Sequence, residues 1–438
     1  MLTRQFLACA LGLFFSFSPC ILAHPSYIDV LMKNQPEKET LSNGMTFIYQ
    51  KDDSSPVSVV NILIQGGKRQ EPEGKEGVAF LTTRLCLELP DQQLLQRLMN
   101  QATNRTFFCR HDFSLIKISC LSENLDEAMN LSTKILKDPL ISGLRIDRIK
   151  ELMNHYRKLQ EDEPINIAHA AALDSLFRGS PYAGSTYGTE TSLKKIKKRD
   201  VENYYEAFVN AKNMVVVVST NLEKEKTLNI MQPYFEKFPV GQPKESDPIS
   251  FVPAEEKSSF FEKDAKQSLV YMAYPLPKLS KKTYVFATML QNLLGRGMNS
   301  KLWSLRTEKK LAYIVNSRAF YMKEGGMLEA YLETDQAKKD LATEELKKTI
   351  QDLYQNGITA EELSVTKVLS QGEVIRENET KEAKSYNLTF MEAIGLGYEF
   401  LNRVLSEIEA TTLEEFNAFI RDVLDPEKAV SITVGPSQ

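Results

Sequence analysis

The feature of this sequence that most constrains its fold is a repeated pattern, one copy in each half of the chain. The first copy is "VENYYEAFVNAKNMVVVVST" at 201–220, and the second is "LEEFNAFIRDVLDPEKAVSITVG" at 413–435. Each predicts an amphipathic helix, a polar turn and then a strand rich in β-branched residues. A chain that carries the same helix and strand unit twice is predicted to contain a duplicated domain.

The length of the chain agrees with two domains. Its 438 residues exceed the roughly 250–300 residues that one hydrophobic core supports. The segment "FPVGQPKESDPISFVPAEEKS" at 238–258 lies between the two copies and is rich in proline and charge, which is typical of a linker. We therefore expect one domain at 27–237 and a second at 259–438.

Both halves show the same coarse order of expected elements. Strands such as "SVVNILIQ" and "SLVYMAYPL" come first, and a helix, a pair of strands, long charged helices and the final helix and strand follow. Strands mixed with paired helices indicate an α+β class, in which helices cover one face of a mostly antiparallel sheet. We expect this architecture in both domains.

Composition bears on the partners of the protein. Apolar residues make up 42% and charged residues 26%, as in an ordinary globular protein, and the net charge is only −4. Such a small charge over this length creates no field that favours nucleic acid or an anionic membrane surface. We expect no nucleic acid partner.

The N-terminus predicts export. Arg4 precedes the apolar run "FLACALGLFFSF", and Pro19 and the small residue Ala23 follow, so residues 1–23 are predicted to be a secretory signal peptide. A short membrane anchor is the alternative, but the run is shorter than the ~20 residues that a span needs. The signal is not an arginine-rich transit peptide, so we expect a bacterial periplasmic protein with no membrane span after cleavage.

Cysteines give little sign of disulfides. The predicted mature chain has Cys86, Cys109 and Cys120, and this odd number is no disulfide framework. Cys109 and Cys120 lie in two apolar runs, "TFFCRHDF" and "SLIKISCL", that are predicted to form a hairpin. We expect both to be buried free thiols.

No catalytic constellation is visible in the residues themselves. Four histidines occur, His24, His111, His155 and His169, and none forms a metal-binding pair at i and i+4. His155 shares a helix face with Glu151 alone and is expected on the surface; His111 is expected at a hairpin turn and His169 at the edge of the core. The chain also lacks the GxSxG, Walker and GxGxxG patterns.

The strongest local signal is "LLGRGMNSKLWSLRTEKKLAYIVNSRAFYMKEGGMLEAYLET" at 293–334. It resembles the C-terminal domain of the M16 peptidases, the inverzincin family that includes insulin-degrading enzyme and the mitochondrial processing peptidase. The segments "TLSNGMTFIYQKDDSSPVSVVNILIQGGKRQEPEGKEGVAF", "GSPYAGSTYGTETSLKKIKKRDVENYYEAFVNAKNMVVVVS" and "GITAEELSVTKVLSQGEV" fit the same pattern in order. The resemblance implies an M16 fold for nearly the whole mature chain.

The same resemblance implies that the zinc site is lost. In active members the helix at this point carries HxxEH, whose two histidines bind zinc and whose glutamate is the general base. These three positions fall on Phe80, Thr83 and Arg84, and the third ligand falls near Tyr156. Zinc needs imidazole, thiolate or carboxylate donors. We expect no metal or cofactor in this chain and no activity of the chain alone.

The other half of an M16 site is present. Arg306 and Tyr313, in "RTEKKLAY", match an arginine and tyrosine that in the family reach the substrate near its scissile bond. An arginine fork and a phenol can hold a peptide carbonyl and stabilise an oxyanion. Alternatively, Arg306 pairs with Glu308 or Glu329 and Tyr313 is a core residue.

The resemblance leads to one main hypothesis and two alternatives. The main hypothesis is a heterodimer in which an HxxEH subunit holds zinc and this chain positions a peptide or unfolded polypeptide. A non-proteolytic scaffold, comparable with the core proteins of respiratory complexes, is the second. The third is a free-standing peptidase that uses His155 and His169, which no ligand spacing supports.

Overall fold

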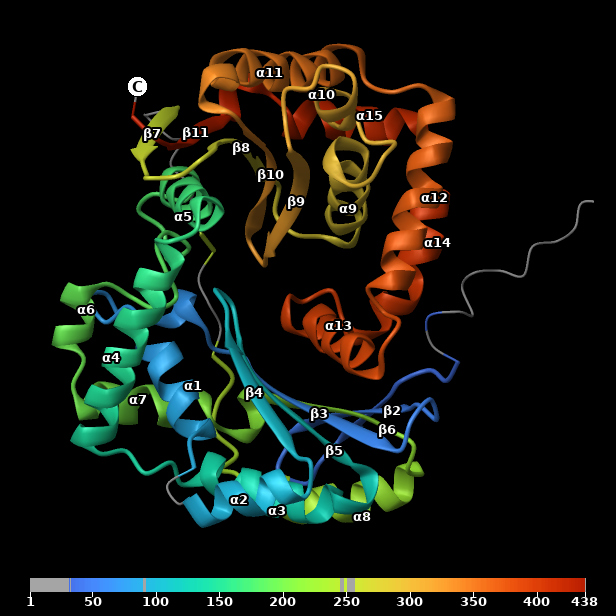
Figure 1. Ribbon diagram of the computed structural model, residues 1–438. Coiled ribbons are helices and arrows are strands. Elements are labelled where there is room, and N and C mark those ends of the chain that lie inside the picture. Colours follow the sequence, from blue (N-terminus) through green and yellow to red (C-terminus); the bar gives the residue numbers. More distant parts are fainter. Residues whose placement is uncertain (1–30, 32, 90–91, 245–247, 250–256, 438) are drawn as a thin grey trace, which may run out of the picture.

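Two stacked halves make up the chain (Figure 1). The computed structural model describes residues 31, 33–89, 92–244, 248–249 and 257–437. The predicted signal peptide, residues 1–23, and part of the predicted linker lie outside these residues. Helix α8 ends at Phe235 and strand β7 begins at Ser258, and the limits of the two domains remain a prediction.

The first half builds a six-stranded sheet in the order β1-β2-β6-β3-β5-β4. Its strands are β1 (Glu37–Thr40), β2 (Thr46–Lys51), β3 (Val57–Ile64), β4 (Asn104–Cys109), β5 (Ser114–Leu121) and β6 (Met214–Thr220). Its helices are α1 (Val78–Leu87), α2 (Gln92–Asn100), α3 (Leu125–Lys137), α4 (Gly143–Gln160), α5 (Pro164–Leu176), α6 (Glu190–Lys195), α7 (Lys198–Phe208) and α8 (Lys224–Phe235).

The second half builds a five-stranded sheet in the order β7-β11-β8-β10-β9. Its strands are β7 (Ser258–Glu262), β8 (Ser268–Leu276), β9 (Ile314–Met322), β10 (Gly325–Thr334) and β11 (Val430–Gly435). Its helices are α9 (Lys281–Gly295), α10 (Trp303–Thr307), α11 (Lys339–Asn356), α12 (Ala360–Arg376), α13 (Lys381–Ala393), α14 (Val404–Ala410) and α15 (Leu413–Val423). Across the described part of the chain, no helix has both the length and the apolar composition that crossing a bilayer requires.

The two sheets share one topology, which confirms the predicted α+β class and duplication. Leaving aside β1 at the edge of the first sheet, both sheets follow one sequence of connections, and each has one parallel pair, β2 with β6 and β7 with β11. The remaining ladders are antiparallel. The repeated sequence pattern corresponds to α7 with β6 and to α15 with β11.

Each sheet has its own helices on one face and a helix from the other half on the opposite face. In β2, Phe47 and Tyr49 pack in the core beneath α1, α3 and α7, whereas Ile48 points the other way and packs in the core that includes α13. Alternate side chains of a strand point to opposite faces, so such a strand is apolar on both. The first sheet is therefore closed by the second half.

The reverse exchange occurs on the second sheet. Helix α5 packs against β8 and β11, and Leu173 and Phe177 lie in one core with Tyr271 and Ile432. In Figure 1 α5 lies beside the second sheet and α13 beside the first. Because each half supplies a helix to the other, we treat the two halves as one packed unit.

Polar contacts reinforce this exchange. The Asn61 side chain on β3 donates hydrogen bonds to the hydroxyls of Ser385 (2.9 Å) and Thr389 (3.0 Å) on α13, and all three residues are buried. Lys384 forms an ion pair with buried Asp52 (2.8 Å). Hydrogen bonds between buried groups are directional, so they fix the position of α13 on the sheet.

The predicted cysteine hairpin is confirmed. Strands β4 and β5 pair antiparallel, and Cys109 lies opposite Ser114, at the end of the hairpin far from Cys120. Cys86, Cys109 and Cys120 are all buried and free. Burial raises the pKa of each thiol to about 12, so these are inert core side chains.

Candidate functional site

Helix α1 carries the positions of the lost HxxEH motif and is held firmly in the core. It follows Gly77, whose φ of 101° lies in the left-handed region that favours glycine. The Glu71 carboxylate accepts hydrogen bonds from the backbone N–H groups of Gly77 (3.0 Å) and Ala79 (2.9 Å). Every residue of α1 except Arg84 is buried. The helix therefore presents its side chains from a fixed scaffold.

An aromatic cluster stands where the first and third metal ligands are expected. The Phe80 ring has its centroid 4.9 Å from Phe107 on β4, 4.8 Å from Tyr187 and 6.3 Å from Tyr156 on α4. Tyr156 and Tyr187 also contact each other, with centroids 5.6 Å apart. Tilted and edge-on arrangements of this kind are the favourable ones for aromatic rings. The site has become a packed apolar contact.

The remaining two motif positions cannot replace a metal ligand or a base. The Thr83 hydroxyl donates a hydrogen bond to the carbonyl of Ala79 (2.8 Å), one turn back in the same helix. The Arg84 guanidinium lies over the Phe107 ring (5.9 Å) and 4.0 Å from Glu88. Among the described residues, no group of three histidine, cysteine or acidic side chains is placed to hold a metal. The side chains at these positions do not fit zinc.

The structure separates the histidines as the sequence predicts. His155 is exposed on α4, and His111 lies in the turn between β4 and β5. His169 on α5 is partly buried and pairs with Glu329. The Nδ1 atom of His169 is thus engaged by Glu329 on the second sheet, and the described structure does not bring His155 and His169 together as ligands of one metal.

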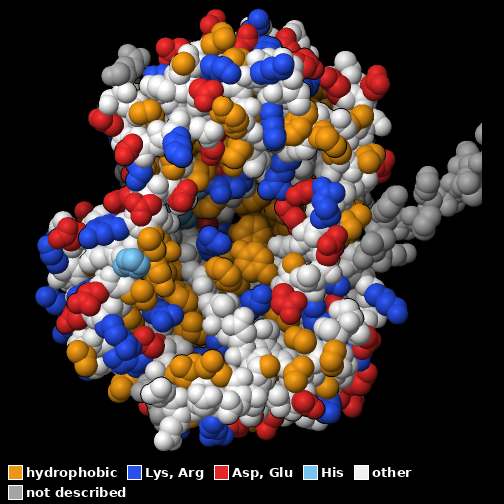
Figure 2. Space-filling view, viewed as in Figure 1, with side chains coloured by type: hydrophobic (Ala, Val, Ile, Leu, Met, Phe, Trp, Pro, Cys, Tyr) orange, Lys and Arg blue, Asp and Glu red, His pale blue; other side chains and the backbone are white. Residues whose placement is uncertain are grey.

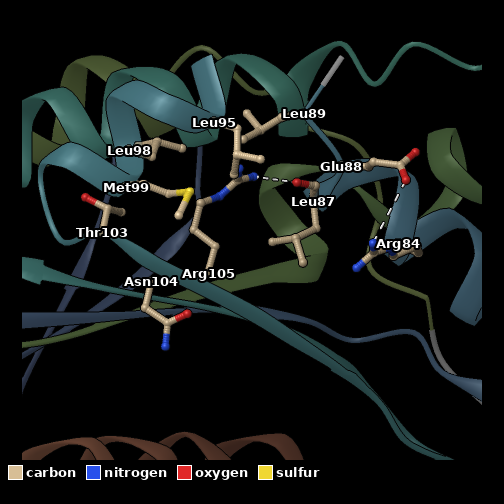
Figure 3. Close-up of a pocket in the computed structure, with 10 residues that line it drawn as sticks. All are labelled: Arg84, Leu87, Glu88, Leu89, Leu95, Leu98, Met99, Thr103, Asn104 and Arg105. Atoms are coloured by element: carbon tan, nitrogen blue, oxygen red, sulfur yellow. Dashed lines mark hydrogen bonds and ion pairs between the residues drawn. The ribbon is translucent and has the colours of Figure 1, made fainter. Parts of the chain in front are cut away.

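A pocket of about 380 Å³ opens beside the C-terminal end of α1 (Figure 3). Its wall is apolar, from Leu87 and from Leu95 and Met99 on α2, which are 46% and 62% exposed. Arg105 crosses it and donates a hydrogen bond to the carbonyl of Leu87 (2.8 Å). Burial, and then the neighbouring charge of Arg84, lower the pKa of Arg105 to about 10. The pocket therefore combines an apolar wall with the two cations Arg84 and Arg105, next to the helix that carries the lost motif.

Arg306 and Tyr313 lie at the surface of the second half. The Arg306 guanidinium on α10 stacks over the ring of Trp303 (4.9 Å), and no ion pair holds it within the described chain. Tyr313 directly precedes β9, is 51% exposed, and donates hydrogen bonds to both carboxylate oxygens of Asp335 (3.0 and 3.1 Å). This hydrogen bond to a carboxylate raises the pKa of Tyr313.

Neither alternative position for this pair is observed. Glu329 pairs with Arg318 and not with Arg306, and Tyr313 is not a core residue. Backbone hydrogen bonds from Leu311 to Leu305 (2.9 Å) and from Tyr313 to Glu333 (2.9 Å) fix the loop between the two residues. Both polar groups are therefore held by the fold and reach solvent.

A second pocket of about 380 Å³ lies between the two halves, and sequence reasoning missed it. The β4–β5 turn, α5, β9 and α13 all contribute to its lining. Figure 2 shows it as a hollow floored by hydrophobic side chains. These elements are distant in the sequence, and the local signals are slight: Phe320 and Tyr321 are adjacent in "SRAFYM", and Tyr386 and Phe390 are four residues apart in "SYNLTF".

The fold and the altered motif agree with comparisons to known proteins. Residues 46–190 match the profile of the insulinase family (peptidase family M16), and residues 195–368 match that of the peptidase M16 inactive domain. The "Non-peptidase homolog YmxG" of Helicobacter pylori is 24% identical over 85% of this chain and 88% of its own. Subunit 1 of the mitochondrial cytochrome b-c1 complex of Bos taurus is 23% identical over 47% of this chain and 44% of its own.

Solved structures show the same fold. The peptidase M16 inactive domain from Pseudomonas fluorescens superposes with a TM-score of 0.83 at 18% identity, over 92% of this chain and 98% of that one. Two profiles of one family cover most of the described chain, and α1 lacks the residues that bind zinc in that family. This chain therefore belongs to the M16 peptidase family, as a member that has lost the zinc-binding motif.

Proposed function

We propose that this chain is the substrate-positioning subunit of a two-chain M16 peptidase. Its partner is an HxxEH-bearing subunit that supplies the zinc and the general base, and the two chains enclose one proteolytic chamber. Arg306 and Tyr313 hold the peptide backbone of a peptide or unfolded polypeptide. Because residues 1–23 are predicted to be a signal peptide, we propose that this complex acts in an exported compartment, the bacterial periplasm.

The observation that carries the proposal is the contrast between the two halves. In the first half, the Phe80 ring packs against Phe107, and the Thr83 hydroxyl is hydrogen-bonded to the carbonyl of Ala79. These motif positions therefore offer no reactive group. In the second half, Arg306 lacks an ion-pair partner in the described chain and Tyr313 is half exposed. Among the described residues, the guanidinium touches only the ring of Trp303 and the phenol only the carboxylate of Asp335, and both reach solvent, so both suit a role toward a molecule outside this chain.

The chemistry of the pair suits a peptide carbonyl. A guanidinium presents several N–H donors in a fixed plane, and a phenol adds one O–H donor. Tyr313 donates its hydrogen to Asp335 in the free chain, so it must turn from this carboxylate to a substrate. Donors of this kind that stabilise negative charge developing on a carbonyl oxygen are worth roughly 10²–10³ in turnover.

Two variants and two matched controls test the proposal. We expect Arg306→Ala and Tyr313→Phe each to lower peptide hydrolysis by the complex about a hundredfold, with unchanged assembly by size-exclusion chromatography. The controls are Arg421→Ala, an exposed arginine on α15, and Tyr234→Phe, whose hydroxyl also binds a carboxylate, that of Asp126 (2.7 Å). Full turnover in both test variants contradicts the assignment.

One observation favours a second candidate, a non-proteolytic assembly subunit. About half of this chain matches a subunit of the cytochrome b-c1 complex, a protein named for its place in an assembly. This alternative predicts that substitutions at Arg306 and Tyr313 have no effect on any activity of the complex. The same set of variants therefore separates the two candidates.

A further inference from the structure

We infer that the pocket between the two halves binds the carboxyl end of a peptide whose last residue is aromatic or large and apolar. The choice of a peptide as the source of this ligand rests on the proposed function. The chemistry of the ligand rests on the pocket itself, through its apolar floor, an unpaired cation and an unused hydrogen-bond acceptor.

The floor of the pocket is built from rings of both halves. Phe113, from the β4–β5 turn, contacts Phe390 on α13 (6.1 Å between centroids), and Phe390 stacks on Tyr386 (6.2 Å). Tyr386 in turn contacts Phe108 on β4 (5.7 Å), which supports the floor without lining the pocket. Figure 2 shows a hollow between the two halves with hydrophobic side chains at its bottom. Aromatic walls in a pocket of this size are typical of sites for a flat or bulky apolar group.

The acidic groups in and behind the pocket wall are already paired: Asp112 lines the pocket, and Glu329 lies behind it against the lining residues His169 and Arg318. Glu329 is fully buried and accepts hydrogen bonds from Tyr271 and Arg318 and contacts His169. Asp112 accepts hydrogen bonds from the Tyr182 hydroxyl (2.6 Å) and from the backbone of Lys323 (2.9 Å). These carboxylates are therefore not free to bind a cationic ligand.

One cation at the pocket has no acidic partner. The Arg110 guanidinium is exposed at the β4–β5 turn and lies over the Phe108 ring (5.6 Å), and no aspartate or glutamate of the described residues pairs with it. Arginine binds carboxylates with two parallel hydrogen bonds. A ligand with a carboxylate therefore complements the exposed Arg110 in the wall of the pocket.

His111 supplies the third feature. Its ring is buried among Tyr182 and Phe320, with centroids at 5.9 and 5.6 Å, and its Nε2 atom has no hydrogen-bond partner. Burial lowers the pKa of His111 to about 3, so the ring is neutral at pH 7. The backbone of Gly184 forms a hydrogen bond with the ring that opposes this shift, and because Nε2 has no partner we assign that bond to Nδ1. The Nε2 atom of this neutral ring is thus a hydrogen-bond acceptor without a donor in the described chain.

These three features together select a class of ligand. The last residue of a peptide carries an amide N–H donor, a carboxylate and a side chain on one carbon atom. His111, Arg110 and the aromatic floor match these groups in turn. The carboxylate of a fatty acid has no hydrogen-bond donor for His111, and a phosphate has no apolar group for the aromatic floor, so neither satisfies all three.

Binding to the chain alone, without a partner subunit, tests this inference. The probes are N-acetylphenylalanine, its amide, and a short peptide that ends in phenylalanine with a free or an amidated carboxyl group, each measured by calorimetry. We expect the free acids to bind at least tenfold more tightly than the amides, because arginine forms charge-assisted hydrogen bonds with a carboxylate and not with a neutral amide. We expect Arg110→Gln to abolish this difference in affinity, and Tyr386→Ala to weaken the binding of all four probes.

The control is Arg421→Gln, which removes an exposed arginine far along the chain on α15. No binding of any probe, or equal binding of acids and amides, overturns the inference. If N-acetylphenylalanine binds and the peptide with a free carboxyl group does not, the natural ligand is not the end of a peptide, and the inference is overturned on that point. Because no hydrolysis is measured, this experiment can succeed where the proposed function fails, and it can fail where the proposed function succeeds.

Discussion

The edge of the Phe80 ring meets Tyr156 with the two ring centroids 6.3 Å apart. These residues stand where the resemblance places the first and third zinc ligands, on helices α1 and α4. The family geometry has thus been kept while its chemistry was replaced by an aromatic contact. The positions that bind zinc in active members now contribute to the core of the first half.

This relationship predicts a structural role for Phe80. We expect Phe80→Ala to lower the free energy of unfolding by about 3–5 kcal/mol, because it removes a ring that is only 6% exposed and packs against three others. Urea unfolding followed by circular dichroism measures this. The matched control is Phe260→Ala on β7, where the ring is 50% exposed, and we expect a change within about 0.5 kcal/mol. Equal effects of the two substitutions argue against a packed cluster at the lost site.

The exchange of helices predicts that the two halves unfold together. We expect Asn61→Ala to cost about 1–3 kcal/mol, since it leaves the buried hydroxyl of Ser385 without its donor from β3. Because α5 and α13 each pack on the sheet of the other half, we also expect one transition in urea. Fluorescence of Trp303, in the second half, and circular dichroism should give coincident curves, and two separate transitions contradict this.

The buried carboxylate of Glu329 predicts a dependence of stability on pH. Burial alone raises the pKa of Glu329, but hydrogen bonds from His169 and Arg318 outweigh it and lower the pKa to about 2, from an ordinary value of 4.5. Its contribution is therefore fully present above pH 4.5 and is lost as the pH falls through 2. We expect Glu329→Gln to be destabilising at pH 7.

The difference in stability between the wild type and Glu329→Gln is the quantity to measure. We expect it to shrink by about 1.4 kcal/mol for each pH unit between 4.5 and 2, because glutamine does not titrate. Urea unfolding at a series of pH values gives this difference directly. A difference that stays constant down to pH 3 shows that the charge of Glu329 does not contribute.

Much of the fold could be predicted from the sequence, but the exchange of helices could not. The repeated helix and strand pattern predicted the two halves, because the 3.6-residue period of a helix and the two-residue period of a strand can be read from a short segment. The strand "MVVVVST" at 214–220 is buried on both faces, and its continuous apolar run indicates this burial. The run cannot say which helix covers the second face, because α13 lies in the other half of the chain.

The candidate site divides in the same way. Residue types alone showed that Phe80, Thr83 and Arg84 cannot bind zinc, because ligand chemistry does not depend on the fold. The ring partners Phe107 and Tyr187, and the meeting of Arg110 with His111 and α13 at one pocket, depend on contacts between distant segments. The exposed position of Tyr313 likewise follows from the loop that holds it.

Peptide hydrolysis by the chain without its predicted signal peptide, alone and mixed with an HxxEH-bearing M16 chain from the same organism, tests the central claim most directly. Zinc is quantified in each purified chain before mixing. We expect cleavage only by the mixture and zinc only in the partner. Cleavage by this chain alone together with bound zinc, or equal activity of the partner with and without this chain, contradicts a substrate-positioning role.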